Sequence, residues 1–172
     1  MRFRGFSLIE LMVTIAVLAI LVTIGLPSFQ GSMRSNRVAT GVNELMASIA
    51  LARSEAIRSP GGAAMCPSEN GSTCLPDDSS WDNGWMVWSD PDGNGLPGGA
   101  NDRVLRYVEG LSGVAIEAST KQAILRFDPR GRAMTPIDFT LASETCPAGH
   151  GLVRDLTLTA TGQVRMERSE CE

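Results

Sequence analysis

An apolar run near the N-terminus, interrupted by a single carboxylate, constrains the fold of this chain more than any other feature. Between Phe6 and Leu26 the only charged residue is Glu10. These 21 residues would extend about 31 Å as a helix, which matches the hydrocarbon core of a bilayer. A lone charge there costs at least about 2.5 kcal/mol. Glu10 therefore needs a partner that offsets its burial, or a role that requires it.

The charges around this run indicate its orientation. Arg2 and Arg4 precede it, and no basic residue follows before Arg34. The positive-inside rule then places the N-terminus in the cytoplasm and the rest of the chain outside. A secretory signal peptide fits poorly, because the run is long and no small-x-small cleavage site follows it. A plain membrane anchor explains the length of the run but not Glu10.

Helical periodicity continues beyond the apolar run. Pro27 should bend the helix rather than end it. Polar residues fill the positions between a stripe of apolar ones, which predicts an amphipathic helix with one buried face. The sequence "SPGG" at 59–62 should stop it, so that the whole helix would run from about residue 7 to 58. The stripe consists of Val38, Val42, Leu45, Ile49, Ala52 and Ala56.

The remainder of the chain is typical of strands and turns. Clusters of Gly, Pro, Asn and Asp separate the candidate strands, and the short gaps favour antiparallel neighbours. The sequence predicts an α+β fold, with a long N-terminal helix packed on antiparallel β-sheet. We expect Trp81, Trp85 and Trp88 to pack in the core and its rim, with Trp85 and Trp88 on opposite faces of one strand. The candidate strands are 84–90, 103–109, 114–118, 123–127, 137–141, 153–160 and 163–167.

The cysteines indicate an oxidising compartment. There are four of them, an even number, in a chain with a membrane-targeting start. Three pairings are possible, of which the local one joins Cys66 to Cys74 and Cys146 to Cys171. A zinc site is the competing interpretation, but no C-x-x-C pair is present and the chain has one histidine. We expect disulfides.

The segment "RGFSLIELMVTIAVLAILVTIGLPSFQ" resembles the class III signal of type IV pilins and type II secretion pseudopilins. The resemblance implies that a dedicated prepilin peptidase cuts after Gly5 and that the new terminal residue, Phe6, is N-methylated. Glu10 becomes the fifth residue of the mature chain. It would neutralise the terminal amine of a neighbouring subunit, since a buried carboxylate is tolerable when it is paired.

Later segments extend the resemblance. "ALARSEAIRS", "WDNGWMVWSDPDGNG", "LRFDPRGRA" and "TLTATGQVR" are similar to minor pilins of the H-pseudopilin, FimT and FimU type. The implied organisation is a leader at 1–5, a transmembrane and filament-core helix at 6–27, its amphipathic half at 28–60, and a periplasmic β-rich domain at 61–172. We expect a single-pass protein of the bacterial inner membrane that joins a pilus or pseudopilus. Its partners would be other pilins or pseudopilins and the prepilin peptidase.

"DPDGNG" at 90–95 has the start of a calcium loop. Asp90, Asp92 and Asn94 match the first half of an EF-hand, but position twelve would be Asn101 rather than the usual glutamate. A glycine-rich hairpin loop explains the same residues. The sequence favours the plain loop and keeps calcium as a weak candidate; it indicates no other metal and no cofactor.

The C-terminal stretch "TGQVRMERSECE" raises the question of DNA. Some FimT-like proteins bind DNA through a Gly-Arg-x-Arg stretch, and the resemblance places Gln163 at its first arginine and Arg165 at its second. Arg168 adds one charge, while neighbouring glutamates offset it. The pI of about 5.1 argues against a general nucleic-acid coat. A solvated final strand is the favoured interpretation, and DNA a less favoured one.

The function that these features favour is that of a minor pilin, which helps to prime a type IV pilus. The H-type pseudopilin of a type II secretion system is the first alternative. A DNA-binding minor pilin of an uptake pilus is the second. No nucleophile with a neighbouring base is indicated, so we expect no enzyme.

Overall fold

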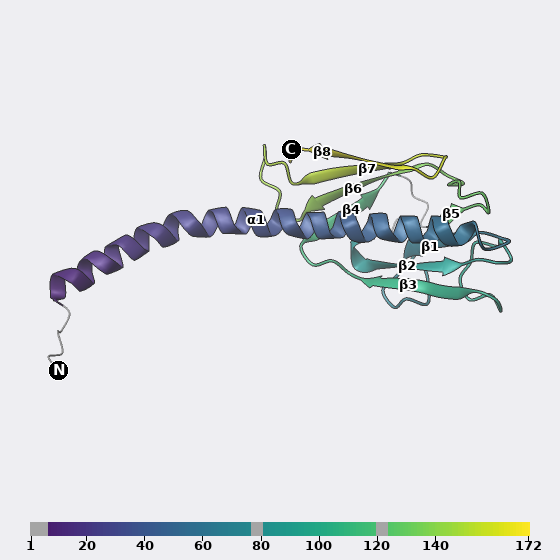
Figure 1. Cartoon of the computed structure of the whole chain (residues 1–172), viewed down its shortest axis with the longest axis horizontal. Coiled ribbons are helices and arrows are strands. Elements are labelled where there is room, and N and C mark those ends of the chain that lie inside the picture. The colour runs from purple at the N-terminus through teal and green to yellow at the C-terminus, as the bar shows by residue number, and fades with distance from the viewer. Residues whose placement is uncertain (1–6, 77–80, 120–123) are drawn as a thin grey trace.

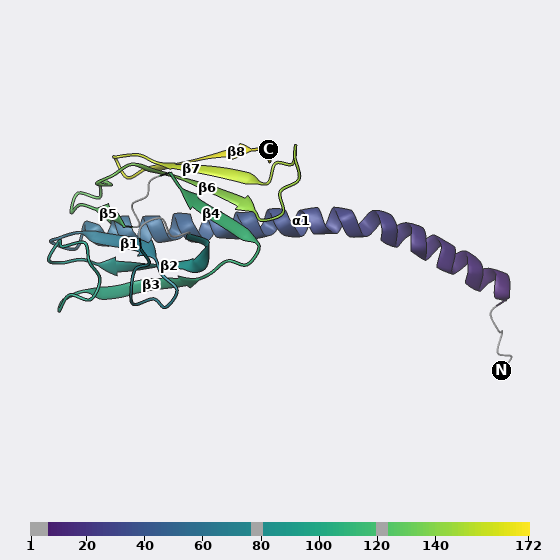
Figure 2. The ribbon, with the colours of Figure 1, turned by 180° about the vertical axis from the view of Figure 1, so that it is seen from behind.

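The computed structural model describes residues 7–76, 81–119 and 124–172 of the 172-residue chain. Its first element is a helix of 49 residues, α1 (Leu8–Ala56), which begins at the N-cap Ser7. The C-terminal half of α1 lies along the β-rich domain, and the N-terminal half extends away from it (Figures 1 and 2). The predicted helix is confirmed, and it continues through Pro27.

The strands form two antiparallel sheets of four strands each. In the first sheet the order is β3 (Arg103–Glu109), β2 (Gly84–Ser89), β1 (Ala63–Pro67) and β5 (Leu125–Phe127). In the second it is β4 (Val114–Ala118), β6 (Ile137–Ser143), β7 (Val153–Leu158) and β8 (Val164–Ser169). The short 3₁₀ helix η1 (Trp81–Asn83) precedes β2.

The α+β prediction is confirmed, with one strand that the sequence analysis did not expect. Each of the seven predicted segments overlaps a strand, although β6 and β8 end two residues later than predicted and residue 123 lies outside the described residues. The additional strand, β1, lies between β2 and β5. Because β1 is buried along its whole length, its side chains lack the alternation that would reveal a half-buried strand.

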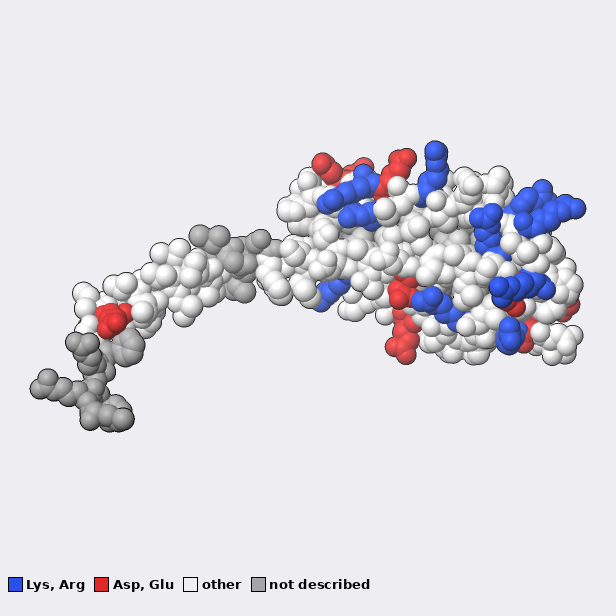
Figure 3. Space-filling view, viewed as in Figure 1, with Lys and Arg blue, Asp and Glu red and all other residues white. Residues whose placement is uncertain are grey.

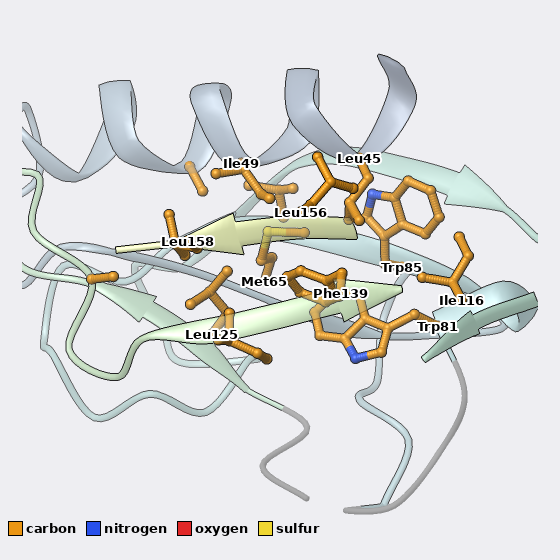
Figure 4. Close-up of a cluster of buried hydrophobic side chains, with 14 of the residues drawn as sticks. Leu45, Ile49, Met65, Trp81, Trp85, Ile116, Leu125, Phe139, Leu156 and Leu158 are labelled. Carbon is orange, nitrogen blue, oxygen red and sulfur yellow. The ribbon is translucent and has the colours of Figure 1, made fainter. Parts of the chain in front are cut away.

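The main core lies between α1 and the two sheets (Figure 4). The predicted stripe of α1 is confirmed, since its six residues are at most 3% exposed. Trp81 meets Phe139 edge to face, with ring centroids 5.1 Å apart. The indole Nε1 of Trp85 donates to the hydroxyl of Ser48, 2.9 Å away, on the buried face of α1.

A smaller cluster covers the other face of the first sheet. It contains Trp88, Met86, Ala64 and Cys66. Trp85 and Trp88 therefore lie on opposite faces of β2, as alternation along a strand predicts. All three tryptophans are buried.

Two disulfides fasten the loops. Cys66, on β1, is bonded to Cys74 in the following loop. Cys146 is bonded to Cys171, which ties the β6–β7 connection to the end of the chain. The backbone N–H of Cys171 also donates to the carbonyl of His150 at 2.9 Å.

Candidate functional site

The N-terminal half of α1 is an apolar surface without a partner among the described residues. Eleven large apolar side chains between Leu8 and Val22 are 45–78% exposed. They occur on every side of the helix, because the run has no polar stripe. A contiguous apolar surface of this extent on a folded chain marks a contact with protein or membrane.

Glu10 lies within this apolar surface, in the first turn of α1. Its backbone N–H donates to the hydroxyl of Ser7 at 3.3 Å, which caps the helix. The side chain is exposed, and no described residue donates a hydrogen bond to its carboxylate. The carboxylate is therefore available to a group from another chain.

The predicted processing site precedes the described part of the chain. Gly5 and Phe6 lie outside the described residues. Within the described residues, no helix has both the length and the hydropathy that crossing a membrane requires.

The C-terminal arginines lie on opposite faces of β8. Residues three apart on a strand point to opposite sides of the sheet, which separates Arg165 from Arg168. Arg168 lies opposite Arg154 of β7, and both side chains donate to the carbonyl of Gly151 at 3.0 Å. Burial, and then the charge of Arg168, lower the pKa of the Arg154 guanidinium. Sequence reasoning did not single out Arg154, which only the register of β7 and β8 reveals.

Carboxylates accompany Arg165 on its side of the sheet. Glu167 follows on the same face of β8, and it lies opposite Asp155 of β7. Asp155 accepts from the hydroxyls of Thr140, at 3.0 Å, and Ser169. The positive charge of Arg165 is therefore offset locally.

Gln163 and Arg165 also line a groove of about 560 Å³ between α1 and the turn before β8. Arg53 of α1 lies in the same groove, where its Nε donates to the carbonyl of Gly131 at 3.0 Å. Arginine side chains gather at this end of the domain, away from the N-terminus (Figure 3). The structure thus separates the basic end from the apolar half of α1.

The predicted calcium residues lie in the loop from β2 to β3. Asp90 is buried, and its Oδ2 accepts from the backbone N–H of Gly95 at 2.9 Å. Burial raises the pKa of this carboxyl. Asn94 braces the loop: its Nδ2 donates to Asp92 Oδ2 at 2.8 Å, and its Oδ1 accepts from the N–H of Leu96 at 2.6 Å.

A residue that the sequence analysis did not select completes this cluster. One carboxylate oxygen each from Asp90, Asp92 and Asp102 lies within 4.8 Å of the other two. Asp102 comes directly after Asn101, the residue that occupies position twelve of the EF-hand pattern. The EF-hand pattern, which has a fixed spacing, therefore missed the third carboxylate by one residue.

Comparison with known protein families assigns the chain to one of them. Residues 41–162, most of the sequence, match the family described as type II transport protein GspH. The chain belongs to the GspH family. Residues 1–26 of this GspH-family protein also match the prokaryotic N-terminal methylation motif. The two matches identify it as a subunit of the minor pilin and pseudopilin class, as predicted.

Solved structures support the fold of the GspH-family chain. It is similar to the type IV minor pilin FimU of Pseudomonas aeruginosa in two crystal forms. The first match has a TM-score of 0.58 and 18% identity, and covers 77% of this chain and 89% of FimU. The second has a TM-score of 0.55 and 19% identity, and covers 75% and 91%. No curated protein matches the GspH-family chain by sequence.

Proposed function

We propose that this GspH-family chain is a minor pilin that enters a type IV pilus through the N-terminal half of α1. The observation that carries the proposal is the exposed apolar surface of that half, with one carboxylate in it. Packing against similar helices would bury the apolar side chains at about 25 cal/mol per Å² of area removed from water. The minor subunit would thereby help to prime the filament.

Glu10 would set the register of this packing. Cleavage between Gly5 and Phe6 creates a positive α-amine, which is N-methylated and still protonated at neutral pH. The carboxylate of one subunit would pair with that amine on its neighbour, because an unpaired charge in an apolar core is strongly destabilising. The side chain of Glu10 is exposed and has no partner among the described residues, which supports this role.

Before assembly, the subunit would be held in the bacterial inner membrane by residues 6–27. The amphipathic half of α1 and the β-rich domain, residues 28–60 and 61–172, would lie in the periplasm. The two disulfides suit such an oxidising compartment. The partners of the chain would be other pilins and the prepilin peptidase, and its role is structural rather than catalytic.

The second candidate is an H-type pseudopilin of a type II secretion system. The description of the matched family as a type II transport protein favours it. Both candidates use the same helix surface and the same carboxylate, so they differ in the filament that the subunit joins. Deleting the gene separates them: loss of surface pili supports the minor pilin, and loss of protein secretion supports the pseudopilin.

The carboxylate is tested by replacing Glu10 with Gln in the cell of origin. We expect Glu10→Gln to lower the amount of the protein in sheared filaments at least about tenfold, with an unchanged amount in the membrane. Glu117→Gln, an exposed glutamate of β4, is the matched control and should assemble normally. Normal incorporation of Glu10→Gln would refute the role of the charge pair.

Processing has a separate test. The intact mass of the purified protein should correspond to a chain that begins at an N-methylated Phe6. In cells without prepilin peptidase the mass should correspond to the unprocessed chain. A mature protein that keeps the Gly5–Phe6 bond in peptidase-competent cells would leave a plain anchored domain as the better description.

A further inference from the structure

We propose that Asp90, Asp92 and Asp102 bind one calcium ion in the loop between β2 and β3. The three carboxylates come from the two ends of that loop: Asp90 directly follows β2, and Asp102 directly precedes β3. Their oxygens converge within 4.8 Å of one another. The site lies at the end of the domain away from the N-terminus (Figure 1), far from the apolar surface that the proposed function uses.

Two buried carboxylate oxygens in this cluster have no hydrogen-bond partner among the described residues. They are Oδ1 of Asp90 and Oδ1 of Asp102. Asp90 is 1% exposed, so water does not reach its side chain. An unsatisfied buried polar atom costs about 1–3 kcal/mol, and more when it is charged. A cation coordinated by these oxygens would remove that cost.

The other oxygen of each residue is held in place by the loop. Asp90 Oδ2 accepts from the N–H of Gly95, and Asp102 Oδ2 accepts from the N–H of Gly99 at 2.8 Å. These bonds orient both side chains before any ion arrives. The remaining oxygens are therefore fixed in position and free to act as ligands.

The local charge fits a divalent ion. Arg126 of β5 is the described cation that pairs with the cluster, with its Nη2 3.5 Å from Asp90 Oδ2. It also donates to the carbonyl of Gly93, which fixes its position. Three carboxylates and one guanidinium leave two negative charges, which a divalent cation would neutralise.

The donor set and its place on an irregular loop suit calcium better than magnesium. Calcium takes about six to eight oxygen ligands at about 2.3–2.6 Å in flexible geometry, and carboxylates are among its usual ligands. Magnesium requires oxygen at about 2.0–2.1 Å in strict octahedral geometry. Three carboxylate oxygens within 4.8 Å of one another on an irregular loop meet the flexible requirement of calcium more readily than the strict one of magnesium.

The bound ion would fix the loop against the start of the β-rich domain. A Cβ at Gly61 would lie 2.4 Å from both the carbonyl oxygen of Asp90 and the nitrogen of Gly93, so the loop abuts the turn after α1. The N–H of Asp90 donates to the carbonyl of Gly62 at 3.1 Å. Calcium would therefore stabilise the junction of α1, β1 and β2 as well as the loop.

The test is calorimetric titration of the full chain, in detergent and after chelator treatment, with calcium chloride. We expect one ion to bind with a Kd of about 10⁻⁴–10⁻³ M, as in extracellular calcium modules, and magnesium to bind at least about tenfold more weakly. Saturating calcium should raise the thermal midpoint by several degrees, because the ion binds the native state alone. Absence of calcium binding to the wild-type chain would overturn the proposal.

Two variants locate the site. Asp92→Asn, at an exposed position, and Asp102→Asn should each weaken calcium binding at least about tenfold while the domain remains folded. The matched control is Asp138→Asn, an exposed aspartate of β6, which should bind calcium as the wild-type chain does. Calcium binding that both cluster variants retain would refute this site. Assembly into filaments is a separate readout, so failure of this test leaves the proposed function standing.

Discussion

At the residue scale, the hydroxyl of Ser48 holds a polar contact inside the core. It is fully buried, donates to the carbonyl of Glu44 at 2.8 Å, and accepts from Trp85 Nε1. Ser48→Ala would leave the indole N–H unpaired, so we expect a loss of about 1–3 kcal/mol in the free energy of unfolding, measured by urea denaturation. Ser54→Ala removes an exposed hydroxyl of α1 and should change stability by less than about 0.5 kcal/mol. Equal effects of the two substitutions would contradict this assignment.

Asp128 stabilises the turn after β5 in a pH-dependent way. The backbone N–H of Arg132, the Arg132 side chain and the N–H of Arg130 donate to its carboxylate, and they lower its pKa below the ordinary value of 3.8. A pKa that is lower in the folded state contributes stability above the unfolded value, and this contribution is lost as pH falls through the folded value.

We therefore expect Asp128→Asn to destabilise the domain at neutral pH and to have a progressively smaller effect as the pH falls below 3.8. Urea unfolding at a series of pH values measures the difference from the wild-type chain. Asp138→Asn, at an exposed aspartate, should give a small difference that does not vary with pH. A pH-independent loss in Asp128→Asn would mean that ionisation of the carboxylate does not contribute to stability, and would contradict this prediction.

The contribution of Asp90 to stability depends on pH in the opposite sense to that of Asp128, because the pKa of Asp90 is raised. Burial is the main cause of its raised pKa, so the folded state binds this proton more tightly than the unfolded state does. The associated stability is complete at low pH and is lost as the pH rises through the folded value. The sequence motif could not indicate this, because the burial of Asp90 depends on the turn around Gly61 and on Arg126, which are distant in the chain.

At the scale of elements, the periodicity of apolar residues was sufficient to predict the helix and most of the strands. The apolar stripe from Val38 to Ala56 predicted the buried face of α1, because every turn of an amphipathic helix repeats the same signal. β1 carries no such signal, since all five of its residues are buried and Pro67 lacks a backbone donor. The division into two sheets was also not predictable, because β1 pairs with β5 across a long stretch of sequence.

The turn that leads from α1 into β1 depends on Gly62. Its φ is +107°, and a Cβ there would lie 2.2 Å from the carbonyl oxygen of Phe127. Gly62→Ala therefore combines backbone strain with a backbone clash, and we expect a loss of about 3 kcal/mol or more in the free energy of unfolding. Urea denaturation of the purified variant measures the loss.

Gly98 offers a matched control for the clash. Its φ is +100°, but a Cβ there would meet no atom within 4 Å. Gly98→Ala should cost only the strain of the left-handed conformation, about 1–2 kcal/mol. If both substitutions had the same cost, the close approach of β5 to Gly62 would be unimportant.

At the scale of the whole molecule, one helix serves two environments. Among the side chains of α1 that the structure describes, the large buried ones lie at Val38 or beyond, whereas the large apolar ones between Leu8 and Val22 are exposed. The globular domain therefore keeps its entire core without the N-terminal half. The sequence predicts this division because the apolar run changes to an amphipathic pattern after Pro27. The partner that covers the apolar half is not encoded in the fold of a single subunit.

The distribution of charge over the whole molecule leads to an expectation about DNA. The net charge is −4, Arg165 and Arg168 lie on opposite faces of β8, and Glu167 accompanies Arg165. Binding of duplex DNA requires several cationic groups on one face, because affinity arises from the counterions that they displace. We expect residues 34–172, which include the whole core, to show no micromolar binding in titrations with labelled duplex at physiological salt.

Arginine side chains gather at the end of the domain away from the N-terminus (Figure 3), so this titration needs a control variant that removes other exposed arginines. The double variant Arg165→Ala, Arg168→Ala should behave as the wild-type domain does, and so should Arg130→Ala, Arg132→Ala in the exposed turn after β5. Micromolar affinity that weakens steeply with salt, and that is lost in the first double variant alone, would instead make this subunit a DNA receptor. That result would require Arg165 and Arg168 to contact one duplex from two faces of an edge strand, which is possible only if the DNA wraps the edge of the sheet beside the Cys146–Cys171 disulfide.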